Sequence, residues 1–406
     1  MNRKLIAVFV LAFLISTAAS AQPLGSAGCY IGPGLAATLL FPYFEVDLGD
    51  PLGVGTLLAI NNGFNAPTLA RFVMWTDWGV PTLAFDLYLP PFDVETINVG
   101  DLFNGTIPST GEGVNLAGFD GCDTDPPSHN NPVLSADDQA QLVADHLGQV
   151  GPFSATCAGS TQGDQIARGY ITVDVVRRCS GVEPGDPTTT PANTALPYFT
   201  DGGGAPGVAT TSNILWGDVI YVDANNSSAQ GSEALPIWAS PGRFAGTDIF
   251  TFYGRFSNWD GRDDRVPLPG IWNQRYLNGG PFAGGADLIV WRDPTTTTAR
   301  ASCGLNPAPF PLEDVTVARD LEGNSANIGM GTSFPLATQR VSIDSLGVPF
   351  TFGYLQVETS LDIVPGQAWI QPSLSASNLF SANFNGTPVG FLCAEDPTPP
   401  ILRPEE

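Results

Sequence analysis

Residues 70–89, ARFVMWTDWGVPTLAFDLYL, contain two runs of strand-forming residues separated by a short turn-forming segment, DWGVP. The second run, residues 82–89, alternates apolar and more polar side chains with the period of a β-strand. Aspartate, glycine and proline between the runs favour a turn. The stretch therefore predicts a β-hairpin in which Phe85 and Leu87 are buried and Asp86, on the opposite face, is more exposed.

Runs of the same kind recur along the chain. They are rich in β-branched and aromatic residues, and the clearest of them alternate with period two. One apolar face per strand is typical of antiparallel sheets that stack as a sandwich. We therefore predict a mainly β protein, an antiparallel β-sandwich of immunoglobulin-like or jelly-roll-like type. The other expected strands cover residues 55–60, 93–99, 170–176, 214–222, 248–254, 287–291, 338–343, 351–359 and 368–377.

One segment has the pattern of an α-helix. Ser135 is a suitable N-cap with Asp138 three residues later, apolar residues follow at helical spacing up to Leu147, and Gly148 provides a stop. Because the helix interrupts the series of strands, we interpret it as a short insert near residues 120–157.

Glycine and proline are abundant, with 46 and 36 residues, whereas hydrophobic residues still make up 43% of the chain. This combination predicts packed β-rich cores with many loops rather than disorder. The length exceeds what one core usually supports, so we predict two β-rich units. A boundary near residue 240 separates a sandwich domain, residues 22–240, from a second unit, residues 241–394. Residues 395–406 are expected to form a flexible tail.

The first 21 residues are typical of a Sec signal peptide. A basic start is followed by an apolar run over residues 5–15 and by the small residues Ala19 and Ala21 before the cleavage point. The apolar run is shorter than the roughly twenty residues that cross a bilayer. We therefore predict export to the periplasm, the cell surface or the medium, and a mature chain that begins at Gln22 without an integral membrane segment.

The chain is strongly acidic, and its charge limits the partners to expect. The formal net charge is −24, and removal of Arg3 and Lys4 with the signal peptide makes it −26. Nucleic acids and anionic membrane surfaces require a basic protein face, so both are disfavoured. Lys4 is the only lysine, which excludes lysine-based catalysis in the mature chain. A glycan or another protein is the partner that the composition leaves open.

Six strings of the sequence resemble those of a set of exported bacterial proteins without an assigned activity. The similarity spans most of the mature chain, and it implies a shared secreted fold. It implies no activity and transfers no functional residue. The strings are FPYFEVDL (41–48), MWTDWGVPTLAFDLYLPPFDVETINVGDLF (74–103), ARGYITVDVV (167–176), NILWGDVIYVD (213–223), RYLNGGPFAGGADLIVWRD (275–293) and FPLATQRV (334–341).

Tryptophans beside carboxylates raise the question of a sugar site. Trp75 and Trp78 flank Asp77 in the hairpin, and Trp259 lies in a second acidic segment. Aromatic residues in sandwiches are mostly core or corner residues, so we favour the hairpin interpretation. The alternative is a carbohydrate-binding module or a glycoside hydrolase. An exposed row beside a groove would favour it, and burial of the rings would remove its basis; the rings concerned are Trp75, Trp78, Trp216, Trp259 and Trp272.

Catalytic signatures are scarce. The two histidines are His129, in a Pro-Asn loop, and His146, in the last turn of the predicted helix, where an imidazole complements the helix dipole. Paired carboxylates for glycoside hydrolysis leave no short motif and stay open among the 40 acidic residues. We predict a noncatalytic extracellular or cell-surface protein. A self-assembling surface-layer or filament subunit is the second alternative.

The six cysteines form no CxxC pairs, and in an exported chain they predict disulfides rather than a zinc site. Two of them flank the helix and are predicted to staple it. The expected pairs are Cys122 with Cys157 and, by elimination, Cys179 with Cys303 and Cys29 with Cys393.

An acidic loop, NWDGRDDR (258–265), is a candidate site for structural calcium. Its ligands would be Asp260, Asp263 and Asp264, although their spacing does not follow the EF-hand pattern. No other cofactor is expected.

Overall fold

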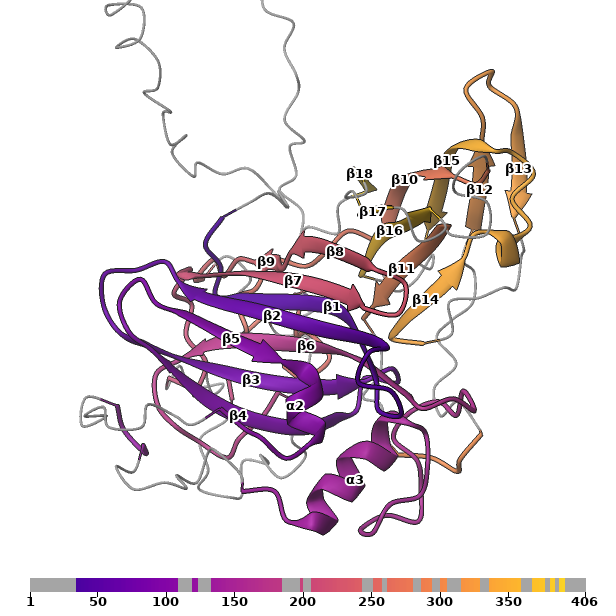
Figure 1. Ribbon diagram of the computed structural model, residues 1–406. Helices are drawn as coiled ribbons and strands as arrows, with labels where there is room; N and C mark the ends of the chain where they lie inside the picture. The colour runs from indigo at the N-terminus through magenta and orange to yellow at the C-terminus, as the bar shows by residue number, and fades with distance from the viewer. Residues whose placement is uncertain are drawn as a thin grey trace, which may run out of the picture.

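The computed structural model describes residues 34–108, 119–122, 133–184, 198–199, 206–242, 251–257, 261–279, 286–293, 300–304, 315–328, 336–358, 367–376, 380–383 and 387–390. Within these ranges the protein is mainly β and contains four antiparallel sheets, as the strand patterns predict (Figure 1). The signal peptide, Trp259, Asp260, His129, Cys29, Cys393 and the C-terminal tail lie outside the described residues.

Two sheets from the first part of the chain stack face to face. We name them the inner and the outer sheet. The inner sheet has the order β4 (Pro81–Leu89), β3 (Thr68–Thr76), β6 (Ile166–Val176), β1 (Thr38–Asp47) and β9 (Leu235–Ile237). The outer sheet has the order β5 (Val94–Asn98), β2 (Val54–Asn62), β7 (Leu215–Asp223) and β8 (Ser228–Glu233). The apolar faces of the two sheets meet in one hydrophobic cluster, so this part of the chain is a β-sandwich.

The second part of the chain forms two further antiparallel sheets, at the upper right of Figure 1. One has the order β13 (Ser325–Ile328), β12 (Val315–Arg319), β15 (Phe352–Glu358), β10 (Ile271–Leu277) and β18 (Thr387–Gly390). The other has the order β14 (Thr338–Ser342), β11 (Ala286–Arg292), β16 (Ala368–Ala376) and β17 (Phe380–Asn383). A short 3-10 turn, Asp344–Leu346, follows β14.

The predicted helix is present as α3 (Ala136–His146). Ser135 caps it, and its side chain and that of Asp138 bond each other's backbone amides in a capping box. A second helix, α2 (Val99–Phe103), replaces the end of an expected strand because the Asn98 side chain accepts a hydrogen bond from the backbone of Gly100.

One expected strand is wrong. A strand is expected over residues 248–254. The described residues of this aromatic segment, 251–257, form consecutive turns instead. Hydrogen bonds from Gly254 N to Thr251 O and from Phe256 N to Tyr253 O close these turns. The aromatic rings of the segment pack into the core without belonging to a sheet.

The alternation of β4 is correct, but the expected exposure of Asp86 is wrong. Phe85 and Leu87 are buried as predicted, and Asp86 has 0% exposed surface. The inner sheet is buried on both faces, since its second face packs against side chains from the second part of the chain and from loops. Asp86 is therefore a core residue. The alternation along β4 indicates only that its side chain points to the opposite face from Phe85.

Residues from both parts of the chain form the hydrophobic cluster that covers the second face of the inner sheet. Trp75 of β3 and Trp291 of β11 both belong to it, and Arg340 of β14 bonds Glu45 of β1 at 2.5 Å. The strand pairings nevertheless keep residues 38–237 and 271–390 in separate sheets. Independent folding on either side of residue 240 stays a prediction.

Both disulfides among the described residues differ from the predicted pairs. Cys122 is bonded to Cys179, and Cys157 is bonded to Cys303, each with a Cα separation of 5.0 Å. Backbone pairing explains the choice, because Cys179 N donates to the carbonyl of Asp120, and Cys157 exchanges two hydrogen bonds with Ala301. The helical insert is thus tied to the segment that follows β6 and to the second part of the chain rather than closed on itself.

Candidate functional site

Three of the candidate tryptophans are buried. Trp75, Trp78 and Trp272 each expose 2% or less of their surface. Trp75 stacks on Tyr170 with 5.6 Å between ring centroids, and its indole nitrogen donates to Thr172 Oγ1 at 2.9 Å. These rings hold the core together, and the sugar-binding interpretation loses them as contacts.

The turn between β3 and β4 connects the hairpin to the segment that follows α3. The Asp77 carboxylate accepts hydrogen bonds from the backbone nitrogen of Ser160, at 2.9 Å, and from the Ser160 hydroxyl. Gly79 adopts a positive φ of 76°, which suits glycine at the tip. Burial raises the pKa of Asp77 to about 6, against the lowering effect of its hydrogen bonds with Ser160. Asp77 thus holds the segment that follows α3 against the hairpin.

A row of polar side chains crosses the buried second face of the inner sheet. Strand register places Thr38, Asp174, Arg71 and Asp86 side by side on β1, β6, β3 and β4. The Arg71 guanidinium lies 3.2 Å from the Asp86 carboxylate. Burial raises the pKa of Asp86 to about 6, although Arg71 opposes the shift. Sequence periodicity missed this row because each strand contributes only one polar residue to it.

Asp174 is the centre of the row. One carboxylate oxygen accepts hydrogen bonds from Tyr198, at 2.7 Å, and from Tyr253, at 3.0 Å. The other oxygen accepts one from the Thr38 hydroxyl and lies 3.3 Å from Arg265. Burial, reinforced by Asp174, raises the pKa of both tyrosines well above the ordinary value. With its acceptor positions occupied by protein donors, Asp174 is placed for structure rather than for turnover.

A second buried group joins the inner sheet to the second part of the chain. Arg255 lies 3.4 Å from the Asp293 carboxylate and donates to the Tyr170 hydroxyl at 3.2 Å. Gln367 donates to Asp293 at 3.2 Å. Burial raises the pKa of Asp293 to about 7, with Arg255 acting against it. The group bridges strands that are distant in sequence.

The two described calcium candidates do not converge. Asp263 is buried and accepts a hydrogen bond from the backbone of Tyr253 at 2.8 Å. Asp264 accepts one from Gly242 at 3.0 Å. Each carboxylate thus binds a different backbone segment. Within the described ranges, no group of three or more His, Cys, Asp or Glu residues is arranged to hold a metal ion.

His146 is buried. Its Nδ1 lies 2.8 Å from the carbonyl of Arg168, and its Nε2 lies 2.8 Å from the Thr82 hydroxyl. Burial lowers the pKa of His146 to about 4. The imidazole stands in the last turn of α3 as expected, and its interaction with the helix dipole stays a prediction. His146 fixes α3 to β6 and β4.

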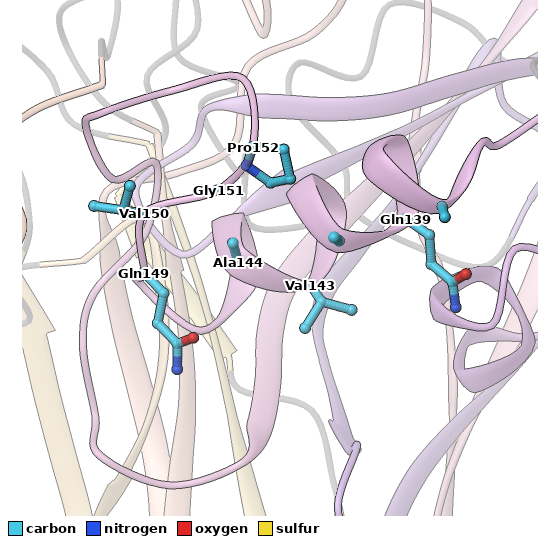
Figure 2. Close-up of a pocket in the computed structure, with 9 residues that line it drawn as sticks. Gln139, Val143, Ala144, Gln149, Val150, Gly151 and Pro152 are labelled. Carbon is cyan, nitrogen blue, oxygen red and sulfur yellow. The ribbon is translucent and has the colours of Figure 1, made fainter.

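A shallow groove runs between α3 and the turn that follows it. Its volume is about 360 Å³, and Figure 2 shows Val143 and Ala144 of the helix beside the turn with Gln149, Val150 and Pro152. A Cβ at Gly151 would meet the amide end of the Gln141 side chain, so a larger residue there would displace that amide. None of the nine lining residues carries a charge, so the groove offers small apolar contacts and two amides, but no acid or base.

The outward face of the outer sheet carries several exposed apolar side chains. Trp216 and Ile220 of β7, Leu57 of β2 and Val94 of β5 expose 38–51% of their surface. Register places Leu57 beside Ile220, and it places Asp218 between the two exposed residues of β7. Trp216 is the described tryptophan on which a ligand could stack. This face is the candidate contact site.

No protein-family model, curated protein or solved structure matches the chain. Among the described residues, no helix combines the length and the apolar character needed to cross a membrane. The functional argument therefore rests on the chain's own residues.

Proposed function

We propose that the protein is exported and acts as a noncatalytic extracellular or cell-surface protein, with the outward face of the outer sheet as its contact surface. Export is supported by the signal-peptide pattern of residues 1–21 and by two disulfides, which are typical of oxidising compartments.

One observation carries the noncatalytic assignment. Among the described residues, acids and a histidine with strongly shifted pKa values lie in the core and are bonded to protein groups; they are Asp77, Asp86, Asp263, Asp293 and His146. Catalytic acids and bases instead need a cleft that a substrate can enter. The perturbed groups of this protein connect strands, the insert and the second part of the chain.

The two alternatives find different support on the outer sheet. A glycan could stack on Trp216, but the described residues provide no second exposed tryptophan beside it. Self-assembly would use the exposed apolar side chains of β2 and β7. In that case the acidic side chains of the same face, Asp218 and Glu233, would face those of a second copy. Repulsion between these like charges would oppose self-assembly.

The proposal is tested by expression of the full chain with its own leader in a bacterium, followed by cell fractionation. The purified product is then assayed with chromogenic glycosides, esters and phosphoesters and with soluble polysaccharides. We expect material outside the cytoplasm, with its leader removed, and no hydrolysis above that of a mock preparation from cells without the protein. Retention in the cytoplasm, or hydrolysis that co-purifies with the protein and is absent from a mock preparation, would overturn the proposal.

A further inference from the structure

Two turns of the sandwich are clamped together by one buried side chain. Asn62, at the end of β2, donates from Nδ2 to the carbonyls of Ala66, at 2.8 Å, and Pro90, at 2.9 Å, with Leu89 O at 3.2 Å. Its Oδ1 accepts a hydrogen bond from Phe64 N at 3.0 Å. The β2–β3 and β4–β5 turns, at the left of Figure 1, are thus fixed relative to each other.

Each of these turns presents a phenylalanine to solvent. Phe64 is 48% exposed and Phe92 is 69% exposed, and Phe92 N donates to Phe64 O at 3.1 Å. Phe92 has a φ of 57°, in the left-handed region that a bulky side chain rarely adopts. Two exposed rings on a rigid support, one of them on a strained backbone, are features that cluster at binding sites.

The two phenylalanines continue the apolar surface of the outer sheet. Val94 lies two residues beyond Phe92, and Asn61 pairs with Val94 on one side and with Trp216 on the other. Val94 is 51% exposed and Trp216 is 44% exposed, whereas Asn61 between them is buried. We call Phe64, Phe92, Val94 and Trp216 the aromatic end of the outer sheet.

Charge around the aromatic end has one sign. Asp218 shares the outward face with Trp216, and Glu95, which pairs with Ile60 and points away from Val94, lies on the edge strand β5. The strands β2, β5, β7 and β8 contain no lysine or arginine. Partial burial, reinforced by the neighbouring Asp93, raises the pKa of Glu95. A positive charge brought to this border would relieve that repulsion, whereas a second copy of the chain would add to it.

We propose that the aromatic end binds a basic protein segment in which apolar side chains alternate with lysine or arginine. The apolar side chains would contact Phe64, Phe92 and Trp216. The cations would face Asp218 on the outward face and Asp93 and Glu95 along the edge strand β5. This inference deepens the proposed function, since it uses the same sheet and assigns a partner chemistry to it.

The test uses the full mature chain and three fluorescein-labelled peptides, GKLKLKLKG, GELELELEG and GKSKSKSKG, in 150 mM salt. Fluorescence anisotropy should show binding of the first peptide and at least tenfold weaker binding of the other two. The second probe removes the positive charge, and the third removes the apolar side chains. Equal binding of GELELELEG or GKSKSKSKG would overturn the proposal.

Two variants locate the site. Phe92→Gly removes one ring and also relieves the strained backbone, so the protein stays folded while peptide affinity falls at least tenfold. Phe64→Ser should act in the same direction. Phe153→Ser, which removes an exposed phenylalanine beside α3, is the matched control and should leave affinity unchanged. Unchanged affinity in both Phe92→Gly and Phe64→Ser would overturn the proposal.

Other occupants of the aromatic end give different results. Self-association in sedimentation velocity that disappears in Phe92→Gly would assign the surface to a second copy and overturn the proposal. Phe92-dependent binding to phosphatidylcholine vesicles, without binding to GKLKLKLKG, would assign it to lipid with the same consequence. Hydrolytic activity would contradict the proposed noncatalytic function without changing any of these binding results.

Discussion

Arg71 and Asp86 form an ion pair of 3.2 Å in which both side chains are buried in the core of the protein. Arg71 also lies 3.9 Å from Glu183, so its charge has a second acidic neighbour. Removal of one partner of a buried pair leaves an uncompensated charge in a medium that solvates it poorly. The pair is therefore a sensitive point of the fold.

We expect Arg71→Leu to lower the free energy of unfolding by about 3–5 kcal/mol, the usual loss when a buried pair is broken. The double variant Arg71→Leu/Asp86→Leu should recover much of this loss, because it leaves neither charge unpaired. Urea denaturation measures both. Asp164→Ala, which removes an exposed partner of Arg168, is the control and should cost about 1 kcal/mol or less. A similar loss in the control and in Arg71→Leu would contradict the prediction.

The buried carboxyls predict higher stability in mild acid. The pKa of Asp77 is raised to about 6 and that of Asp293 to about 7, above the ordinary value of 3.8. The folded protein thus binds more protons than the unfolded chain between about pH 4 and pH 7, so these groups stabilise the fold at low pH and lose this contribution as pH rises. His146 has the opposite effect on the pH dependence of stability, because its pKa is lowered to about 4, and it is one group against several carboxyls.

We therefore expect the free energy of unfolding to fall by on the order of 1–3 kcal/mol between pH 5 and pH 7.5. Urea denaturation at several pH values measures the slope. Asp77→Asn should flatten it, because asparagine keeps an acceptor for Ser160 and does not titrate. Stability that rises over this range in the wild-type protein would refute the assignment of raised pKa values.

The disulfides predict a specific peptide map and a specific stability loss. Nonreducing digestion should yield Cys122 linked to Cys179 and Cys157 linked to Cys303. The second bond spans 146 residues, so its loss in Cys157→Ser/Cys303→Ser should cost about 3–5 kcal/mol through the unfolded chain. A Cys122 peptide linked to Cys157 would show that the helical insert is closed on itself.

The strands were predictable because alternation is a local property, whereas the burial of Asp86 depends on a distant part of the chain. Period two places Asp86 opposite Phe85, but its environment is set by Arg71 across the hairpin and by the cluster that covers the second face. The predicted disulfide pairs were wrong for a similar reason. Cys122 and Cys157 flank one helix in sequence, yet backbone pairing brings Cys179 to Cys122.

The aromatic end was missed because Phe64 and Phe92 lie in turns, where no period assigns them to a face. Each is a single large apolar residue among turn-forming neighbours, in NNGFNAP and LPPFDV. That contrast is the signal that sequence alone offers, since a turn residue of this kind has no core to enter. The clamp by Asn62, which joins turns 28 residues apart, is visible only in three dimensions.

Asn62 itself gives the last prediction. Because its side chain is buried and bonds both turns, Asn62→Ala should lower the free energy of unfolding by about 1–3 kcal/mol, the cost of leaving backbone partners unsatisfied. Asn62→Asp keeps the acceptor for Phe64 N but loses the donors, so it should free the β4–β5 turn preferentially. Hydrogen exchange should then show faster exchange at Phe92 N in both variants and at Phe64 N mainly in Asn62→Ala. Asn65→Ala, an exposed position in the same β2–β3 turn, should change neither stability nor exchange. Equal protection of Phe92 N in wild type and in Asn62→Ala would show that the two turns are held together without the clamp.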